Sequence, residues 1–419
     1  MSGAGLENRE GTAAPQDVRG TDAAVAWLLR QSHMMRPDEL PQLASSACRL
    51  LGAKGCRLYL VTRDQRSLAR LPEPGPDSEG EPELTLDGTV AGRAFRHTEM
   101  IASADGQRLW VPLLDGTERL GVLELLVDSA DQAERLREPA LAVAALLAEL
   151  VVSKGQYTDA FESVRRALPM GVAAEMLWRQ LPPLTFACDR FVVTARLEPW
   201  SEVGGDAFDY SIHGDMLRLA VFDGMGHGLG ATLLASVALA AYRNARRAGQ
   251  DLLATARTID GVLAAQFGTE SFVTAVLAEL DLETGVVRTL CAAHPAPLLV
   301  RGGRSLGELD TEPGRPLGVG SRDDTVVTAS LQPGDRILMF SDGVVEARSP
   351  AGAFFGTDRL IDLLVREESG QQPPPETLRR LILAVLDHQR GALQDDATLL
   401  LLEWAGDSAA VLPQQQVRT

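Results

Sequence analysis

Residues 217–228 read LRLAVFDGMGHG, and this stretch indicates how the second half of the chain folds. The apolar run at 217–222 predicts a strand that ends at Asp223. Gly224 allows a sharp turn and leaves its backbone carbonyl accessible. The glycines that follow lead into a long helical pattern at 230–248. A carboxylate beside a free carbonyl at a strand end suits a hard divalent cation such as Mg²⁺ or Mn²⁺, because such ions prefer oxygen ligands.

Aspartates also lie at the ends of other predicted strands. Asp206 follows two glycines in EVGGD, Asp342 precedes Gly343 after the run RILMF, and the pair Asp395 and Asp396 precedes an apolar run at 398–403. One Asp-Gly step alone is usually only a turn. Carboxylates that a fold crowds together repel one another and raise each other's pKa, so several converging on one point imply a cation between them.

The pattern of apolar residues between these motifs predicts a mixed α+β fold. Pairs of helical runs interrupt strand runs, which favours two antiparallel sheets covered by helical layers over a parallel sheet. Strands are expected at 191–197, 207–212, 217–222, 272–280, 286–292, 297–300, 326–331, 335–340 and 398–403, and helices at 230–248, 252–267, 357–367 and 375–389.

The four aspartate motifs in this order resemble the PPM family of metal-dependent protein serine/threonine phosphatases, in its bacterial stage-II-sporulation and sigma-regulatory branch. The resemblance covers residues 172–404 and includes AHPAP at 293–297 and FVTA at 272–275. It implies an α-β-β-α sandwich and two Mn²⁺ or Mg²⁺ ions. It also implies in-line hydrolysis of phosphoserine or phosphothreonine by a metal-activated water, with no covalent enzyme intermediate.

The resemblance also implies a role for each residue of the site. Asp223 bridges the two metals and Gly224 supplies a carbonyl. Asp342 completes the ligands of one metal together with Asp395 or Asp396. Which of these two aspartates binds the metal is open, and members of the family favour the first. Asp206 supports the other metal, so the expected catalytic residues are Asp206, Asp223 and Asp342.

One departure concerns the proton that the leaving group needs. Eukaryotic members carry a histidine directly after the Asp-Gly step, whereas this chain has Met225 there. His227 either substitutes for that histidine or only shapes the loop, and both interpretations stay open. Metal-bound water is then the expected proton source. His294 is expected to be a structural residue in a turn.

The first half of the chain has a different pattern. Helical runs at 23–29 and 39–51 precede a strand at 56–61, a short helix at 88–95, a hairpin around 115–118 and a helix at 139–152. This order resembles a GAF domain over residues 20–152, although PAS domains have a similar length. The resemblance implies dimerisation and a possible small ligand. His97 and Cys56 are better read as surface and core positions than as ligand contacts.

The domain organisation follows from these two resemblances. We expect a disordered tail at 1–18, a GAF-like sensor domain at 19–152 and a helical linker at 153–185. A PPM-type phosphatase domain at 186–405 and a second disordered tail at 406–419 would follow. The linker is broken at 169–171 and either transmits a signal or serves as a passive spacer.

Composition excludes several other functions. The net charge of −17 argues against nucleic-acid and membrane-surface binding. The four cysteines form no C-x-x-C pair and predict a reduced, cytoplasmic protein, and no apolar stretch is long enough for a membrane-spanning helix. A cysteine phosphatase loop, a Walker-type loop and a basic helix-turn-helix are all absent from the sequence.

The two resemblances together imply a GAF-regulated, homodimeric phosphatase whose substrate is a phosphorylated STAS-type anti-anti-sigma protein, and this is the leading hypothesis. The main alternative is a weak or inactive sensor or scaffold of a partner-switching pathway, against which the intact aspartates speak. A metal-dependent nucleotide hydrolase would share the two-metal chemistry but would need a base-stacking pocket, and the second half has few aromatic residues to build one.

Overall fold

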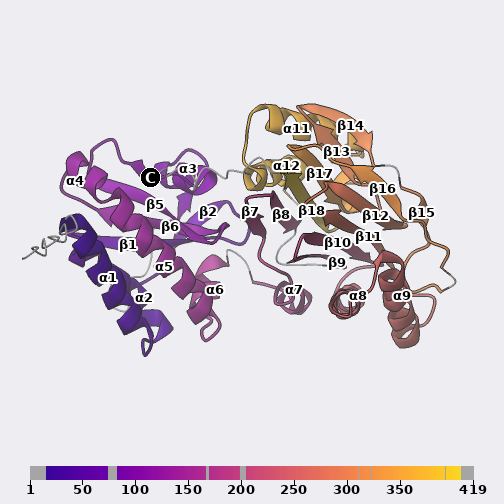
Figure 1. Cartoon of the computed structure of the whole chain (residues 1–419), viewed down its shortest axis with the longest axis horizontal. Helices are drawn as coiled ribbons and strands as arrows, with labels where there is room; N and C mark the ends of the chain where they lie inside the picture. Colours follow the sequence, from indigo (N-terminus) through magenta and orange to yellow (C-terminus); the bar gives the residue numbers. More distant parts are fainter. Residues whose placement is uncertain are drawn as a thin grey trace, which may run out of the picture. The chain divides into compact units, whose positions relative to one another are not determined.

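The computed structural model describes residues 16–73, 83–166, 169–198, 204–309, 311–320, 322–391 and 393–406 (Figure 1). The tails expected at 1–18 and 406–419 fall largely outside these residues. The chain divides into two compact units. The first comprises Met1–Thr62, Arg66–Asp115 and Arg119–Arg165, and the second comprises Arg63–Gln65, Gly116–Glu118 and Arg166–Thr419.

The first unit is built on one six-stranded sheet with the order β3-β2-β1-β6-β5-β4. Its strands are β1 (Gly55–Val61), β2 (Ser67–Arg70), β3 (Leu84–Thr85), β4 (Ile101–Ala102), β5 (Arg108–Asp115) and β6 (Glu118–Leu126). Its helices are α1 (Gln16–Ser32), η1 (Pro37–Glu39), α2 (Leu40–Leu50), α3 (Val90–His97), α4 (Ala130–Arg135), α5 (Arg137–Gly155) and α6 (Ala160–Arg165).

Alternation along β1 divides the side chains of this sheet between two cores. Leu58 and Leu60 pack with α1, α2 and α5, whereas Tyr59 and Val61 pack on the opposite face with α3. The short strands β2, β3 and β4 were not expected from the sequence. Helix α1 begins at Gln16, inside the span expected to be a tail, because its single glycine does not stop a helix.

The second unit contains two six-stranded sheets. One has the order β15-β12-β11-β10-β9, with β16 also paired to β12, and the other has the order β14-β13-β17-β18-β8-β7. The strands are β7 (Thr185–Cys188), β8 (Phe191–Glu198), β9 (Asp206–His213), β10 (Met216–Gly224), β11 (Val273–Asp281), β12 (Val286–Ala292), β13 (Leu298–Arg301), β14 (Arg304–Glu308), β15 (Pro313–Gly314), β16 (Val327–Ser330), β17 (Asp335–Phe340) and β18 (Ala397–Trp404).

Helices cover both sheets of this unit. They are α7 (Val172–Trp178), α8 (Leu229–Arg247), α9 (Leu252–Phe267), α10 (Asp342–Val345), α11 (Thr357–Ser369) and α12 (Pro374–His388). Along β17, Ile337 and Met339 point into the core shared with the other sheet, and Leu338 and Phe340 pack with α11 and α12. Residues of α8 and α9 pack on the first sheet. The layers are therefore α8/α9, sheet, sheet and α11/α12 (Figure 1).

The segment expected to be a helical linker has more varied structure than predicted. Helix α5 ends at Gly155, α6 and α7 are short, and β7 begins at Thr185 and pairs antiparallel with β8. The sequence does not indicate β7, because four residues after a double proline are too few to show a period. Within the described part of the chain, no helix is both long and apolar enough to cross a membrane.

Candidate metal centre

Strand pairing brings the first two aspartate motifs together. In the register of β9 and β10, Asp206 lies opposite Asp223, and Thr274 of β11 lies opposite Asp223 on its other side. The backbone N–H of Gly224 donates to the carbonyl of Gly205 at 2.9 Å. A Cβ on Gly205 would lie 2.1 Å from the Gly224 carbonyl oxygen, so only glycine permits this approach.

The other sheet supplies the remaining motifs. Asp342 is the first residue of α10, directly after β17, and Asp396 directly precedes β18. The hydroxyl of Ser341 donates to Asp206 Oδ2 at 2.6 Å and accepts from the backbone N–H of Thr398 at 2.9 Å. This buried serine therefore links the aspartate of one sheet to the strand ends of the other.

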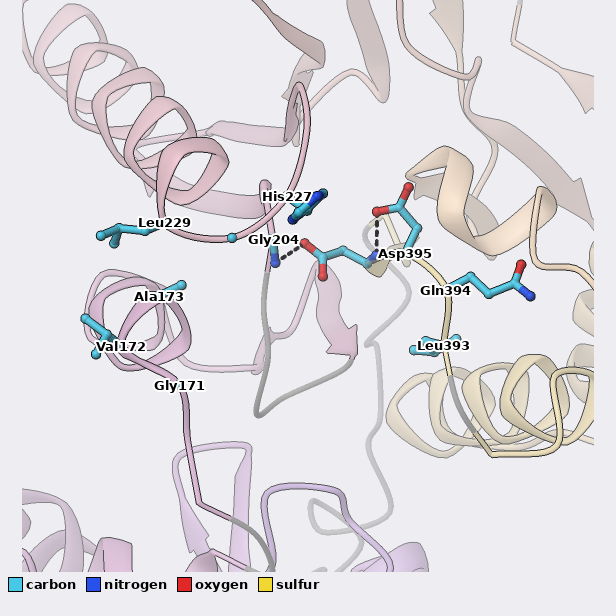
Figure 2. A pocket seen from close by; sticks show the side chains of 11 residues that line it. Gly171, Val172, Ala173, Gly204, His227, Leu229, Leu393, Gln394 and Asp395 are labelled. Carbon is cyan, nitrogen blue, oxygen red and sulfur yellow. Dashed lines mark hydrogen bonds between the residues drawn. The ribbon is translucent and has the colours of Figure 1, made fainter.

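Asp395 and Asp396 differ in their surroundings, which the sequence could not distinguish. Asp396 is buried, and its Oδ2 accepts from the backbone N–H groups of Gly204 at 2.5 Å and of Asp206 at 3.3 Å. Asp395 is exposed, and its Oδ1 accepts from the N–H of Asp396 at 2.9 Å (Figure 2). Asp396 thus holds the turn before β9, while the carboxylate of Asp395 faces open space.

The carboxylates interact strongly with one another. Burial raises the pKa of Asp223 to about 7, and the charges of Asp342, Asp395 and Asp396 add to this rise. Burial likewise raises the pKa of Asp396 to about 6, although backbone N–H groups act against it. The pKa of Asp206 is also raised, first by burial and then by Asp223 and Asp396. Such crowding is costly unless protons or cations neutralise it.

Asp342 belongs to the same neighbourhood. Burial raises the pKa of its carboxyl, and the charges of Asp395 and Glu346 raise it further. Asp342 and Asp395 together line a pocket of about 160 Å³. Arg348 also lines this pocket, and its positively charged guanidinium lies 4.4 Å from the ring centroid of Phe354.

A second pocket, of about 480 Å³, adjoins the first at Gln394 and Asp395. Val172, Ala173 and Leu229 lie on one side of it (Figure 2). Leu393 and Gln394 lie on the opposite side in the same view. The aspartates thus lie between two pockets with different linings. The smaller pocket contains the guanidinium of Arg348, and the larger one has aliphatic walls.

The donor set fits hard divalent cations. Several carboxylates and the carbonyl at Gly224 are oxygen ligands of the kind that Mg²⁺ and Mn²⁺ prefer. Within the described residues, no three His, Cys, Asp or Glu side chains are close enough to form a complete ligand set by themselves. The mutual effects on pKa nevertheless place Asp223, Asp342 and Asp395 in one electrostatic neighbourhood. A cation there would relieve their repulsion.

The histidines occupy different surroundings. His227 is exposed in the glycine-rich loop before α8 and lines the larger pocket. His294 is buried, its Nδ1 lies 2.8 Å from the Thr274 hydroxyl, and burial lowers its pKa to about 3, so it is neutral. A buried neutral imidazole matches the structural role expected for His294.

Sequence reasoning assigned no role in the site to Thr274 and Ser341, the two hydroxyl residues beside the aspartates. Ser341 is fully buried between an apolar strand and Asp342. A polar residue at the end of a wholly apolar run was the available signal, because buried hydroxyls need hydrogen-bond partners. Arg348 and Gln394 were also missed, and nothing in their local sequence marks them.

Part of this chain matches a known protein family. Residues 213–405 match the family model described as Stage II sporulation protein E (SpoIIE), a segment that contains Asp223, Asp342, Asp395 and Asp396. Among curated proteins, protein IcfG of Synechocystis sp. is 22% identical over 238 residues, which are 50% of this chain and 37% of IcfG. The chain therefore spans little more than a third of that relative's length.

Solved structures with a similar fold include three from bacterial proteins. The RsbU and RsbW domains of a Mycobacterium tuberculosis protein are 27% identical, with 52% of this chain and 62% of that chain covered and a TM-score of 0.47. The SiaA-PP2C domain of Pseudomonas aeruginosa is 20% identical (60% and 99% covered, TM-score 0.48). The PP2C phosphatase domain of SpoIIE from Bacillus subtilis, solved with a fragment of its regulatory domain, is 21% identical (52% and 63% covered, TM-score 0.43).

The sequence match carries the assignment. Residues 213–405 match a SpoIIE-type phosphatase domain of the PPM class; Asp223, Asp342, Asp395 and Asp396 lie within this segment, whereas Asp206 lies just before it. The PPM phosphatase class expected from the motifs is thereby confirmed for this part of the chain. The GAF resemblance of the first unit stays a prediction.

Proposed function

We propose that this chain is a metal-dependent protein phosphatase that hydrolyses phosphoserine or phosphothreonine. The observation that carries the proposal is the group of crowded carboxylates with raised pKa values, which lies within the segment that matches a phosphatase family. Buried acidic groups without basic partners are expensive to ionise, and divalent cations would make their ionised form stable.

Within this proposal each aspartate has its own task. Two Mn²⁺ or Mg²⁺ ions would be held by Asp223 and the Gly224 carbonyl, with Asp342 and Asp395 contributing to one of them and Asp206 supporting the other. The exposure of Asp395 supports its assignment as the ligand of the pair. The two backbone N–H groups that Asp396 accepts support a role in positioning the turn before β9.

The chain's own residues prepare the site for hydrolysis. When bound, the two ions supply an activated water and neutralise charge on the phosphoryl oxygens. Asp206, Asp223 and Asp342 fix where that charge lies, and Ser341 orients Asp206 through its hydrogen bond. Asp396 anchors the turn through Gly204. Pre-set ligands of this kind lower the cost of organising the site for each turnover.

The direct test is release of phosphate from a phosphoserine protein with and without Mn²⁺. We expect Asp223→Asn to abolish Mn²⁺-dependent turnover, while Asp215→Asn, an exposed aspartate of the same unit, retains it. Mn²⁺ binding followed by calorimetry should weaken only in the first variant. Turnover that needs no metal, or that survives Asp223→Asn, would sink the proposed site. Absence of turnover on any phosphoprotein would favour the scaffold hypothesis.

The finer proposals concern regulation and partners. We propose that the first unit is a GAF-type sensor with a small ligand, that the chain is a cytoplasmic homodimer, and that its substrate is a phosphorylated STAS-type protein of a sigma-regulatory pathway. The single sheet of the first unit, with separate cores on its two faces, supports a self-contained sensor. Equal turnover by the full chain and by a chain that begins at Arg166 would count against regulation.

A further inference from the structure

The larger pocket has a wall that metal binding does not explain. Leu229 and Val172, the first residues of α8 and α7, both line it. Their side chains are 56% and 76% exposed. Single exposed apolar residues are common on protein surfaces, but several that line one hollow beside a polar centre mark an interaction site.

The position of Leu229 is fixed by its surroundings. Gly228 precedes it with a φ of +73°, and the carbonyl of Gly228 accepts from the N–H of Thr232 at 3.0 Å. The hydroxyl of Thr232 also donates to the carbonyl of Gly204, next to the aspartate motif. Leu229 is thus held in a defined place relative to Asp206 and Asp396, as a recognition residue requires.

The chemistry of the lining restricts what can occupy the pocket. Leu393 lies across from Leu229, and the polar edge is formed by Gln394, Asp395 and His227 (Figure 2). Among the described residues of the lining there is no lysine or arginine and no Phe, Tyr or Trp. An acidic side chain would meet Asp395 without a counter-charge, and a nucleotide base would find no benzene or indole ring on which to stack. An aliphatic side chain fits.

We propose that this pocket binds an apolar side chain of the substrate protein, located beside the phosphorylated residue, and that Leu229, Val172 and Leu393 determine this preference. The inference rests on the proposed function. Asp395 lines the pocket and also belongs to the proposed metal centre, so a phosphoryl group bound there leaves its neighbouring residues at the pocket. Consecutive residues of an extended chain are only about 3.3 Å apart along the strand, which brings a near neighbour into reach.

The test uses the full chain with Mn²⁺ and two sets of phosphoserine peptides that differ only in carrying leucine or serine at the positions flanking the phosphoserine. We expect the wild type to favour a leucine peptide in kcat/KM by roughly tenfold or more. Leu229→Ser and Val172→Ser should each bring that ratio towards one. Leu306→Ser, whose side chain is 53% exposed on β14, should keep the wild-type ratio.

The ratio separates recognition from structural damage. A variant that merely loosens the fold lowers both values of kcat/KM together and leaves their ratio unchanged, which would overturn the proposal. Equal values for the leucine and serine peptides in the wild type would also overturn it. Hydrolysis of p-nitrophenyl phosphate by the wild type reports on the proposed function separately. Affinities of fluorescent leucine and serine peptides, measured alongside, decide the pocket's role even without turnover, and equal affinities would refute it.

Discussion

Two buried aspartates lie three residues apart on β9, and they differ in whether basic side chains neutralise their charge. Asp206 and Asp209 are each 1% exposed. Asp209 accepts hydrogen bonds from Arg243 at 2.8 Å and from Arg246 at 2.7 Å, both on α8. In the described part of the chain no basic side chain forms an ion pair with Asp206, and its neighbours Asp223 and Asp396 raise its pKa.

The difference teaches how to distinguish a structural carboxylate from one kept for a ligand. Asp209 points towards α8 and is neutralised by the protein itself, so it needs nothing further. Asp206 points towards the other sheet, where Ser341 provides a hydrogen bond but no charge. Among the described residues two arginines face Asp209 and none faces Asp206, so the proposed metal ions would supply the counter-charge that the protein does not give Asp206.

The largest expected effect is on the structural side of this comparison. Asp209→Ala leaves two arginines without their carboxylate, and removing one partner of a buried ion pair costs about 3–5 kcal/mol. We expect a loss of this size in the free energy of unfolding, measured by urea denaturation. Asp206→Asn should not lower the stability of the metal-free protein, because it removes repulsion. Equal losses of unfolding free energy in the two variants would contradict the distinction between Asp209 and Asp206.

The second prediction concerns the response to metal. Mn²⁺ at a hundred times its dissociation constant should raise the free energy of unfolding by about 2.7 kcal/mol for one site. Thermal shift assays with and without Mn²⁺ measure this gain. We expect Asp206→Asn and Asp342→Asn to reduce it, and Asp281→Asn, at the opposite end of β11 from Thr274, to preserve it. A gain that persists in Asp342→Asn would place the metal elsewhere.

Ser341 gives a sharper, smaller effect. Ser341→Ala removes the hydroxyl that orients Asp206 and leaves every carboxylate in place. Residues that orient metal ligands typically contribute 10–100-fold to affinity, so we expect Mn²⁺ affinity to fall roughly tenfold in calorimetric titrations. Ser211→Ala, on the strand that carries Asp206 but remote from the motifs, is the control. Unchanged affinity in Ser341→Ala would make the hydrogen bond incidental.

The last prediction is a pH dependence of the metal-free protein. Folding raises the pKa of Asp223 from 3.8 to about 7, so the folded state keeps a proton that the unfolded chain has lost. The free energy of unfolding should therefore fall as pH rises from about 4 to about 7 and then level off; a pKa difference of about 3 corresponds to a fall of about 4 kcal/mol. Asp223→Asn should flatten this part of the profile. A stability that rises over the same range in the wild type and not in the variant would contradict the shift.

Much of the fold of the second unit could be predicted from periodicity. The bounds of α9, β12 and β17 match the expected ranges, because each is a long apolar or amphipathic run bounded by turn residues. Strand β14 was missed because its sequence, RSLGE, is mostly polar and three of its five residues are exposed. Such a strand forms by pairing with β13, a tertiary cause that local sequence does not carry.

The site could be predicted as a set of motifs but not as an arrangement. The order of the aspartates indicated which residues should converge, and their role as metal ligands stays a prediction. The contrast between Asp395 and Asp396 was inaccessible, because it depends on which carboxylate faces the N–H of Gly204 across the fold. The same holds for Ser341, whose partner lies 135 residues away.

One last consequence follows from the close approach at Gly343. A Cβ there would lie 1.8 Å from the carbonyl oxygen of Asp396, just as one on Gly205 would strike Gly224. The proposed ligands thus come from two sheets that face each other, with Asp206 and Asp223 on one and Asp342 and Asp395 at the strand ends of the other. The proposed metal centre therefore lies at the interface of the two sheets, and bound ions would link them. A small shift of one sheet relative to the other would separate the ligands of the ions without altering any ligand residue, so the catalytic rate would depend on the alignment of the two sheets.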